Sequence, residues 1–184
     1  MHYFTTFPLV QYDPNNEDHP QLAVDITRRF KISDVLKNNR IVYYEYDIQD
    51  HDRADAMAER YYGDSRLDWL LFVVNQMYDP YFQWPLNYSQ FDAYIRQKYG
   101  SPSIAMATTH HYEQIITTRK EYYSNYDNTV IMIPEQTLVV DYTTYLSLGT
   151  SLRKVITTFD YEEDLNNKKR TIKIMDKALN FWLK

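Results

Sequence analysis

The stretch from Asp50 to Pro85 constrains the fold most strongly, because it specifies two short helices joined by a tight turn. In its first part, apolar residues recur at the i, i+3, i+4 and i+7 spacing of one helix face: Ala54, Met57, Ala58 and Tyr61. Gly63 follows, and glycine readily adopts the left-handed conformation that is usual just past a helix end. The first helix is therefore expected to end at Gly63.

A second helix is predicted directly after this turn. Ser65, with an acid three residues later, is typical of a helix start. An apolar stripe at helical spacing follows, formed by Leu67, Leu70, Leu71 and Val74. Further apolar side chains lie around it, so that little of this helix is expected to face water: Trp69, Phe72 and Val73. Asn75 and the Asp79–Pro80 pair are predicted to end it.

Composition limits the classes of protein to which the chain can belong. A length of 184 residues suffices for one compact domain, or for a small domain with arms. A net charge of -5 argues against a nucleic-acid interface, which would be basic. The absence of cysteine excludes disulfides and thiolate metal sites, and fits folding in a reducing cytoplasm. The sequence also predicts no signal peptide and no membrane span.

Tyrosine is the most unusual feature of the composition, with 19 tyrosines against 3 glycines. A tyrosine side chain combines a large apolar body with a polar tip, and is enriched at protein interfaces. The high tyrosine content is equally compatible with a tyrosine-rich core and an ordinary surface. Composition alone leaves both interpretations open.

Residues 1–40 are expected to form an N-terminal arm followed by a helix. Residues 3–12 are apolar and aromatic without a clear period, and 13–20 read as a polar linker. Residues 22–38 suit either a helix or a strand followed by a helix that starts at Ser33 or Asp34. The β-branched and aromatic run over 41–47 then predicts a strand.

The middle of the chain changes from helical to strand-like patterns. Ser89 with Asp92 starts a third predicted helix, which Gly100 ends. Residues 101–159 are rich in threonine, tyrosine and isoleucine, with strand-like runs over 112–118, 129–133 and 137–142. A last extended segment is expected over 152–159. This region is predicted to be a small antiparallel sheet or a pair of hairpins.

Residues 160–184 are predicted to form the longest helix. Acids crowd its first turn and bases its later part, which is the order that the helix dipole favours. Two apolar stripes run along it, formed by Ile172, Met175, Leu179 and Trp182 and by Ile174, Ala178 and Phe181. A terminal helix that is apolar on two faces needs two partners, so one face is expected to contact a neighbouring subunit.

No group of residues in the sequence predicts catalysis or metal binding. His110 and His111 lie beside Glu113, but adjacent residues of a strand point to opposite faces, so a solvated or hydrogen-bonded pair is expected. The acids near Asp52 lack the glycine and the distal glutamate of a calcium loop. With so few glycines, a phosphate-binding loop is nearly excluded. The sequence predicts no enzyme activity, no cofactor, no metal and no small-molecule substrate.

The markers in the Asp50–Pro85 stretch resemble those of a lysin motif (LysM). These markers are the strand over 41–47 and the residues Tyr61, Tyr62, Gly63, Asp64, Trp69, Asn75, Asp79 and Pro80. The aromatic extension over 81–85, the helix to Gly100, and a second match at 161–162 and 167–172 are not typical of sugar-binding modules. Together they resemble the base plate wedge protein 53 family of contractile-tailed phages.

This resemblance implies an α+β fold with a LysM-like βααβ core, an inserted small antiparallel sheet, an N-terminal arm and a long C-terminal helix. The parts are expected at 1–40 (arm and helix), 41–100 (LysM-like module with its following helix), 101–159 (β-rich region) and 160–184 (interface helix). It further implies a structural subunit of the virion, made in the host cytoplasm, that clamps neighbouring baseplate wedge subunits during assembly. The implied partners are the core-bundle proteins of the wedge and a sheath-initiator-like subunit.

The candidate residues fall into two groups. The predicted module core comprises Tyr61, Gly63, Trp69, Leu70, Val74, Asn75 and Pro80. The predicted partner interface comprises Phe4, Phe7, Tyr12, Tyr81, Phe82, Trp84, Ile172, Met175, Leu179, Phe181 and Trp182. The alternative hypothesis is a LysM-type module that binds peptidoglycan or chitin; the bulky apolar loop over 79–85 argues against it.

Overall fold

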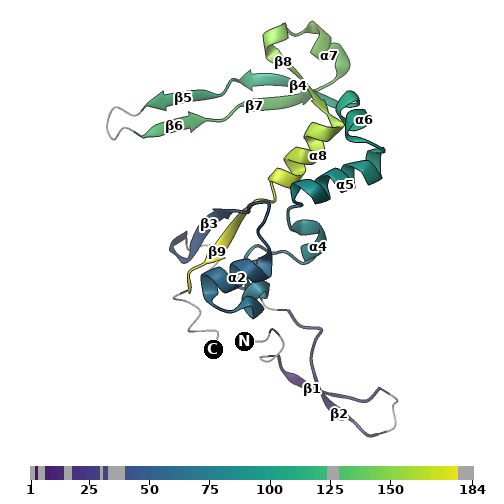
Figure 1. The fold of residues 1–184 in the computed structure, drawn as a ribbon, viewed down its shortest axis with the longest axis vertical. Coiled ribbons are helices and arrows are strands. Elements are labelled where there is room, and N and C mark those ends of the chain that lie inside the picture. Colours follow the sequence, from purple (N-terminus) through teal and green to yellow (C-terminus); the bar gives the residue numbers. More distant parts are fainter. Residues whose placement is uncertain are drawn as a thin grey trace. The chain divides into compact units, whose positions relative to one another are not determined.

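The computed structural model describes residue 3 and the ranges 7–14, 18–29, 31–32, 40–123 and 129–177. It mixes helices and strands, consistent with the predicted α+β class. The chain divides into two compact units, one formed by residues 1–87 and 167–184 and the other by residues 88–166 (Figure 1). In sequence, the second unit is an insertion in the first. No helix among the described residues has the length and apolar character required to cross a bilayer.

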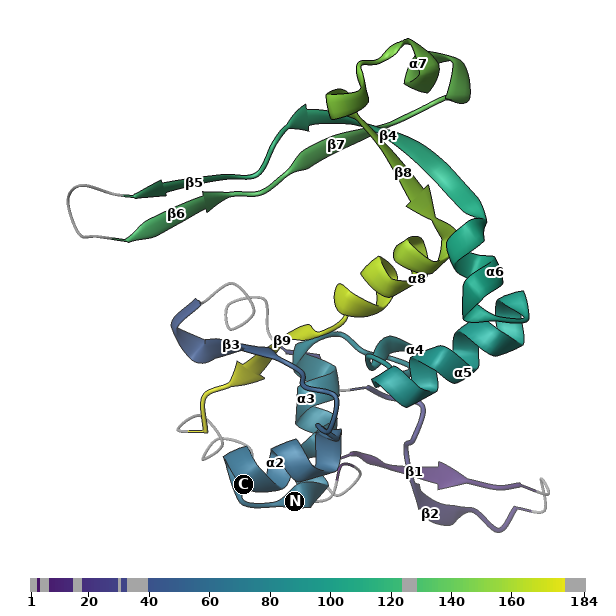
Figure 2. The ribbon, with the colours of Figure 1, turned by 45° about the horizontal axis from the view of Figure 1, so that its top comes forward.

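Two strands and two helices form the core of the first unit. They are β3 (Tyr43–Asp47), α2 (Ala54–Tyr62), α3 (Asp68–Val74) and β9 (Thr171–Met175). β3 and β9 pair antiparallel, with Tyr43 opposite Met175 and Asp47 opposite Thr171. Figure 2 shows both helices beside this strand pair, and buried residues from all four segments or their adjoining loops pack together: Ile48, Met57, Leu71, Ile172 and Ile174.

The predicted ends of the two helices in this core are confirmed, whereas the second helix starts later than Ser65. Gly63 ends α2 in the left-handed conformation, with φ of 77°, and its N–H donates to the carbonyl of Glu59. A short turn, η3 (Ser65–Leu67), precedes α3, and Asp64 rather than Ser65 caps it by accepting from the Arg66 N–H. α3 ends at Val74, and Asn75 is the residue that caps its C-terminal end, as predicted. The segment after it, expected to be extended, contains the short helix α4 (Pro80–Gln83).

The prediction of a helix over 160–184 was wrong for residues 168–175, and residues 178–184 lie outside the described part of the chain. α8 (Thr158–Asn167) ends at Asn167, and β9 follows. In β9 the side chains alternate, with Ile172 and Ile174 buried and Thr171 and Lys173 exposed, which is the period of a strand. The spacing of the apolar residues over 171–175 was interpreted as helical, because so short a segment fits both the helical and the strand period. The pairing with β3 decides in favour of the strand.

The N-terminal part of the first unit contains a hairpin. β1 (Leu9–Tyr12) pairs antiparallel with β2 (Gln21–Val24). The extended chain predicted at the start of 22–38 is thus confirmed, whereas the helix predicted to start at Ser33 or Asp34 lies outside the described residues. A short turn, η2 (Arg40–Val42), leads into β3, so the strand begins two residues later than predicted.

The second unit combines helices with the predicted antiparallel sheet. Its helices are α5 (Tyr88–Tyr99), α6 (Pro102–Ala107), α7 (Tyr142–Ser147) and α8, with the short turn η4 (Thr150–Leu152). Its sheet has the strand order β7-β4-β8, formed by β4 (Thr109–Thr117), β7 (Gln136–Val140) and β8 (Arg153–Thr157). A separate hairpin is formed by β5 (Lys120–Tyr123) and β6 (Val130–Ile133). The helices α6 and α7 were not predicted.

Helices α5, α6 and α8 supply the buried residues of the second unit. Phe91 and Ile95 of α5 and Ala105 of α6 are buried. The ring of Phe91 packs edge-on against that of Phe159, with centroids 5.6 Å apart. The buried Thr158 hydroxyl donates to the carbonyl of Ala105 at 2.7 Å, which ties the start of α8 to α6.

Candidate protein–protein interface

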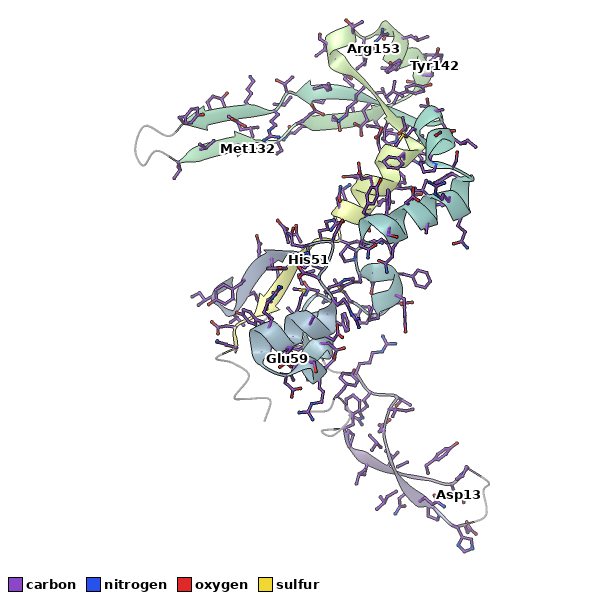
Figure 3. All side chains as sticks on the ribbon, viewed as in Figure 1. Asp13, His51, Glu59, Met132, Tyr142 and Arg153 are labelled. Carbon is purple, nitrogen blue, oxygen red and sulfur yellow. The ribbon has the colours of Figure 1, made fainter. Side chains whose placement is uncertain are left out.

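The β5–β6 hairpin exposes apolar side chains on both of its faces. Because paired residues of antiparallel strands share a face, Tyr122 and Ile131 lie on one face and Tyr123 and Val130 on the other. Every residue of β5 is exposed, and Tyr123 retains 72% of its accessible surface. Figure 3 shows side chains on both sides of this ribbon, with Met132 labelled on β6. On both faces, the described apolar side chains of this hairpin retain about half or more of their accessible surface, except for the half-buried Ile133.

The β1–β2 hairpin has the same character. Leu9 and Leu22 lie on one face and Val10 and Tyr12 on the other, as the pairing of Leu9 with Val24 and of Tyr12 with Gln21 requires. All of them are exposed, Leu22 by 72%. An isolated two-stranded hairpin is only marginally stable in water, and contiguous exposed apolar surface marks interaction sites. Both hairpins therefore have the properties expected of segments that pack on a partner.

The predicted aromatic interface residues of the first unit divide between surface and core. Tyr81 and Phe82 of α4 are exposed by 90% and 77%. Tyr12 is also exposed, whereas Phe7 is half-buried and its ring packs edge-on against Tyr3. Trp84 packs against the buried core and lies edge-on to Phe72, with ring centroids 5.9 Å apart. Phe4 lies outside the described residues.

The structure corrects the prediction that Ile172 and Met175 face a partner. Both are buried, at 2% and 5% exposure, in the core of the first unit. They were misplaced because β9 was expected to be helical, which put them on an outer stripe. The remaining candidates on that stripe, Leu179, Phe181 and Trp182, lie outside the described residues.

The residues predicted to build the module core lie together in the first unit. Leu70 is fully buried with Val42 and Met175, and Trp69 and Val74 pack partly buried against them. Tyr61 is half-buried against the neighbouring cluster, and Gly63 ends α2. Pro80 stands at the first position of α4, where a missing N–H costs nothing. The Asn75 side chain connects the end of α3 to β9 by hydrogen bonds to the Leu71 and Lys173 carbonyls.

Asp52 is a buried carboxylate that ties the loop after β3 to α2. It accepts from the Tyr46 hydroxyl at 2.8 Å, the Gln49 N–H at 2.9 Å and the Arg60 guanidinium at 3.2 Å. Burial acts to raise its pKa, but these hydrogen bonds and the charge of Arg60 outweigh burial and hold the pKa below its usual value. Each partner favours the ionised form, so Asp52 is a structural anion.

Arg170 performs a similar role at the junction before β9. Its guanidinium donates to the Ile48 carbonyl at 3.1 Å, to the Asp50 carboxylate at 2.7 Å and to the Leu86 carbonyl at 3.3 Å. Next to it, the Lys169 ammonium donates to the Phe82 carbonyl at 2.9 Å. This basic run therefore makes contacts inside its own unit, where the fixed fork of an arginine can satisfy several acceptors.

In the second unit, Glu162 of α8 is a buried carboxylate held by α5. It accepts from the Lys98 ammonium at 2.6 Å, the Tyr99 hydroxyl at 2.7 Å and the Tyr94 hydroxyl at 3.1 Å. Burial acts to raise its pKa, but Lys98 and the two hydroxyls outweigh it, and the pKa lies below its usual value. This cluster fixes α8 against α5.

The alternation of side chains along a strand predicted that His110 and His111 point to opposite faces. This prediction was wrong, because the two rings face one another. The Nδ1 atoms of His110 and His111 lie 2.7 Å apart, and His111 Nε2 lies 3.2 Å from a Glu113 oxygen. The pairing of β4 with β8 shifts register between Thr109 and His111, which turns the two rings toward one another. The expected hydrogen-bonded pair is observed. Within the described ranges, no three His, Cys, Asp or Glu residues form a group that could hold a metal ion.

The β5–β6 hairpin is the part of the candidate interface that sequence reasoning missed. The run from Val130 to Ile133 was identified as a strand, and its four apolar residues in succession signalled that neither face is polar. Such a run is also typical of a strand buried on both faces. Only the structure distinguishes the two, because it shows both faces uncovered within the unit.

Comparisons with known proteins identify the family to which the chain belongs. The family model described as base plate wedge protein 53 matches residues 2–182. A relative, the baseplate wedge protein gp53 of Enterobacteria phage T4, is 33% identical over 86 residues, which cover 44% of this chain and 43% of that protein. The match to that relative therefore spans less than half of its length, whereas the family model covers nearly the whole chain. The chain belongs to the base plate wedge protein 53 family.

Proposed function

We propose that this protein is a structural subunit of the baseplate wedge in a contractile phage tail, and that it clamps neighbouring wedge subunits together during assembly. The observation that carries the clamping role is the exposure of apolar side chains on both faces of two hairpins, β1–β2 and β5–β6. Burial of apolar surface is favourable, so a hairpin that is apolar on both faces gains the most binding free energy when partner proteins cover both faces. Two such ribbons on one chain suit a protein that connects its neighbours.

The partners in this proposal follow from the family. They are other wedge subunits: the core-bundle proteins and a sheath-initiator-like subunit. The residues proposed to contact them are those of the two hairpins, the exposed Tyr81 and Phe82 of α4, and Leu179, Phe181 and Trp182 near the C-terminus. No chemical step is part of this role, because the protein acts by binding.

We also interpret the core of the first unit as LysM-like. The order β3, α2, α3, β9 with an antiparallel strand pair supports this interpretation, as does the left-handed Gly63 between the helices. In this interpretation the second unit is an insertion between the second helix and the closing strand. The core then serves as the support for the binding segments of its own unit, which are the β1–β2 hairpin and α4.

The experiment that tests the clamping role changes one hairpin and measures assembly. Replacing Ile131 and Met132 together by glutamate places a charge on each face of β6. Both are about half exposed, so the fold is expected to remain intact. Because a central interface residue can carry about 2–4 kcal/mol, recovery of the variant in purified particles is expected to fall at least about tenfold.

A matched control is available in the same unit. Ile104 and Met106 of α6 are the same residue types with nearly the same exposure, and changing them to glutamate adds the same charge. This control is expected to enter particles normally. Normal incorporation of the hairpin variant, with circular dichroism unchanged for both proteins, would contradict the proposed role of β5–β6.

The alternative function, binding of peptidoglycan or chitin, rests on one observation. Tyr81 and Phe82 are exposed beside the loop after α3, and aromatic rings can stack on sugars. Titration calorimetry of the purified protein with N-acetylglucosamine oligomers separates the two functions. The structural proposal predicts no saturable heat, and micromolar binding that is lost in Tyr81→Ala would favour the carbohydrate hypothesis.

A further inference from the structure

A groove of about 390 Å³ lies in the first unit beside the end of α3. Its walls come from the N-terminal part of the unit, from β3 and β9, and from the last turn of α3 with the loop that follows it. Its lining includes Arg29, Phe72, Met77, Tyr78 and Lys173. Most of the lining side chains are apolar or aromatic, which is usual for a binding groove.

The charge of this groove is opposite to that of the chain. Its described lining contains three cations, Arg29, Lys31 and Lys173, and no carboxylate. The whole chain carries a formal net charge of -5. Cations gathered in a concave apolar site focus a positive potential, because the low-dielectric walls reduce screening. An occupant with negative charge is thus favoured here, against the average field of the protein.

Contacts within the first unit hold the groove in a fixed shape. The Arg29 guanidinium lies over the Tyr78 ring, 5.4 Å from its centroid, which fixes one cation at the wall. The backbone of Lys173 exchanges two hydrogen bonds with the side chain of Asn75. Gln76 has φ of 56°, a left-handed conformation that is rare for residues other than glycine. This conformation turns the chain after α3, and the Met77 N–H donates there to the Phe72 carbonyl.

We propose that this groove binds an acidic, partly apolar peptide segment of a neighbouring tail protein. This proposal rests on the assembly role given above, because it names the chemistry of one partner contact. The carboxylates of the segment pair with Arg29 and Lys173, and an apolar side chain fills the space beside Phe72 and Met77. A neutral oligosaccharide accepts hydrogen bonds from these cations but forms no ion pair with them, which is why an acidic peptide is the better match.

The first test uses the purified full-length chain and a peptide array. The array carries overlapping fifteen-residue peptides from the other tail proteins of the same phage. Bound peptides are expected to be rich in aspartate or glutamate with apolar residues between them. Fluorescence anisotropy with the tightest peptide then gives its Kd. An array with no bound peptide, or with bound peptides of basic composition, would overturn the proposal.

Charge variants test whether the groove itself is responsible. Arg29→Gln with Lys173→Gln is expected to weaken the peptide about tenfold or more. The matched control is Arg53→Gln with Arg96→Gln, which removes the same charge from two exposed arginines outside the groove and is expected to leave Kd unchanged. If the groove variant fails to fold, the unmodified chain still provides a test. Its Kd should rise about tenfold between about 50 mM and 500 mM salt, and a salt-independent Kd would contradict charge pairing. Competition by N-acetylglucosamine oligomers would likewise overturn the peptide assignment.

A photo-crosslinking residue in place of Tyr78 tests the contact in the particle. Tyr88 provides the control, because it is a similarly exposed tyrosine outside the groove. The variant at Tyr78 is expected to crosslink to an acidic segment of another tail protein. Incorporation into particles without any such crosslink would refute the groove proposal and leave the assembly role intact. Absence of the chain from particles would instead refute the assembly role, while the peptide binding would still decide the groove chemistry.

Discussion

Asn75 and the backbone of Lys173, 98 residues apart in the chain, exchange two hydrogen bonds of 2.8 Å. The Asn75 amide nitrogen donates to the Lys173 carbonyl, and the Lys173 N–H donates to the Asn75 carbonyl oxygen. A side-chain amide thus pairs with β9 as a neighbouring strand would. The same amide nitrogen also donates to the Leu71 carbonyl at the end of α3, so that one residue connects a helix end to the closing strand.

Replacing Asn75 by alanine is expected to lower the free energy of unfolding of the first unit by about 2–3 kcal/mol, because two backbone groups of Lys173 lose their partner. Asn75→Asp is expected to cost at least as much, since a carboxylate cannot donate to the Lys173 carbonyl. The measurement is the protection of the backbone amides of residues 171–175 against hydrogen exchange, which should fall in both variants. Gln97→Ala, at an exposed position of α5, is the control and should leave exchange unchanged. Equal protection in Asn75→Ala and the control would disprove the role of the bridge.

Gln76→Gly is expected to stabilise the first unit by about 0.5–1 kcal/mol. Gln76 occupies the left-handed position after α3, where its N–H donates to the Val73 carbonyl and the Met77 N–H donates to the Phe72 carbonyl. This is the Schellman arrangement, whose left-handed position is usually glycine. The prediction is checked by the midpoint of urea unfolding. Gln97→Gly, in the interior of a helix, should destabilise instead by a similar amount.

Measuring both the stability and the peptide affinity of Gln76→Gly tests whether the left-handed conformation serves the groove. If the strained conformation serves only to shape the groove, the glycine variant keeps its peptide affinity while it gains stability. A loss of stability on Gln76→Gly would mean that the glutamine side chain makes contacts that outweigh the backbone strain.

Acid is expected to weaken the second unit through Glu162. Its pKa in the folded protein lies below the usual glutamate value, so its stabilising contribution is fully present above about pH 4.3, the pKa of an unperturbed glutamate. That contribution is lost as the pH falls through the folded pKa. Glu162→Gln is expected to be clearly less stable than the unmodified chain at pH 7, and the difference should shrink as the pH falls below about 4.

The measurement for Glu162 is hydrogen exchange over α5 and α8 as a function of pH, because two units need not unfold in one transition. The exposed neighbour Glu163 supplies the control variant, Glu163→Gln. A stability difference between Glu162→Gln and the unmodified chain that stays constant from pH 7 to about pH 3 would contradict the ionic role of Glu162.

Two truncations separate the core strand from the residues that follow it. Removing residues 171–184 deletes β9, and with it Ile172, Ile174 and Met175 from the buried core. Unfolding of the first unit is expected, because the loss of a single large core side chain already costs about 2–5 kcal/mol. Removing residues 178–184 is expected to leave the circular dichroism of the chain unchanged and to reduce its incorporation into particles. Normal incorporation of this shorter truncation would argue against Leu179, Phe181 and Trp182 as contacts.

In the first unit, the features that depend on neighbouring residues were predicted correctly, whereas the strand that depends on a remote partner was not. The end of α2 followed from Gly63, and the end of α3 from Asn75, because each depends on residues within one or two turns. The strand β9 was missed because what decides its structure is β3, which lies more than 120 residues earlier. A run such as 171–175 satisfies both helical and strand periods, and no nearby residue resolves the ambiguity.

For the candidate interface, the sequence predicted which residues are apolar or aromatic, but not which of them are exposed. Tyr81 and Phe82 were identified because they depart from a sugar-binding pattern, and both are exposed. Trp84 belongs to the same run, yet it packs on the core. Sequence gives the hydrophobicity of each residue but not which face the rest of the chain covers, so the exposure of β5–β6 required the three-dimensional structure.

The separation of β3 from β9 also has a consequence for synthesis. The ribosome delivers β3, α2 and α3 early, but the strand that completes their sheet is made only after the whole of residues 88–166. At about 5–20 residues per second, this leaves the first unit without its closing strand for several seconds or more. Throughout that interval, the surfaces later covered by Ile172 and Ile174 are open to chaperones, and to other nascent copies on the same messenger RNA. The inserted unit can complete its own fold meanwhile, so the order of folding is expected to run from the middle of the chain outward.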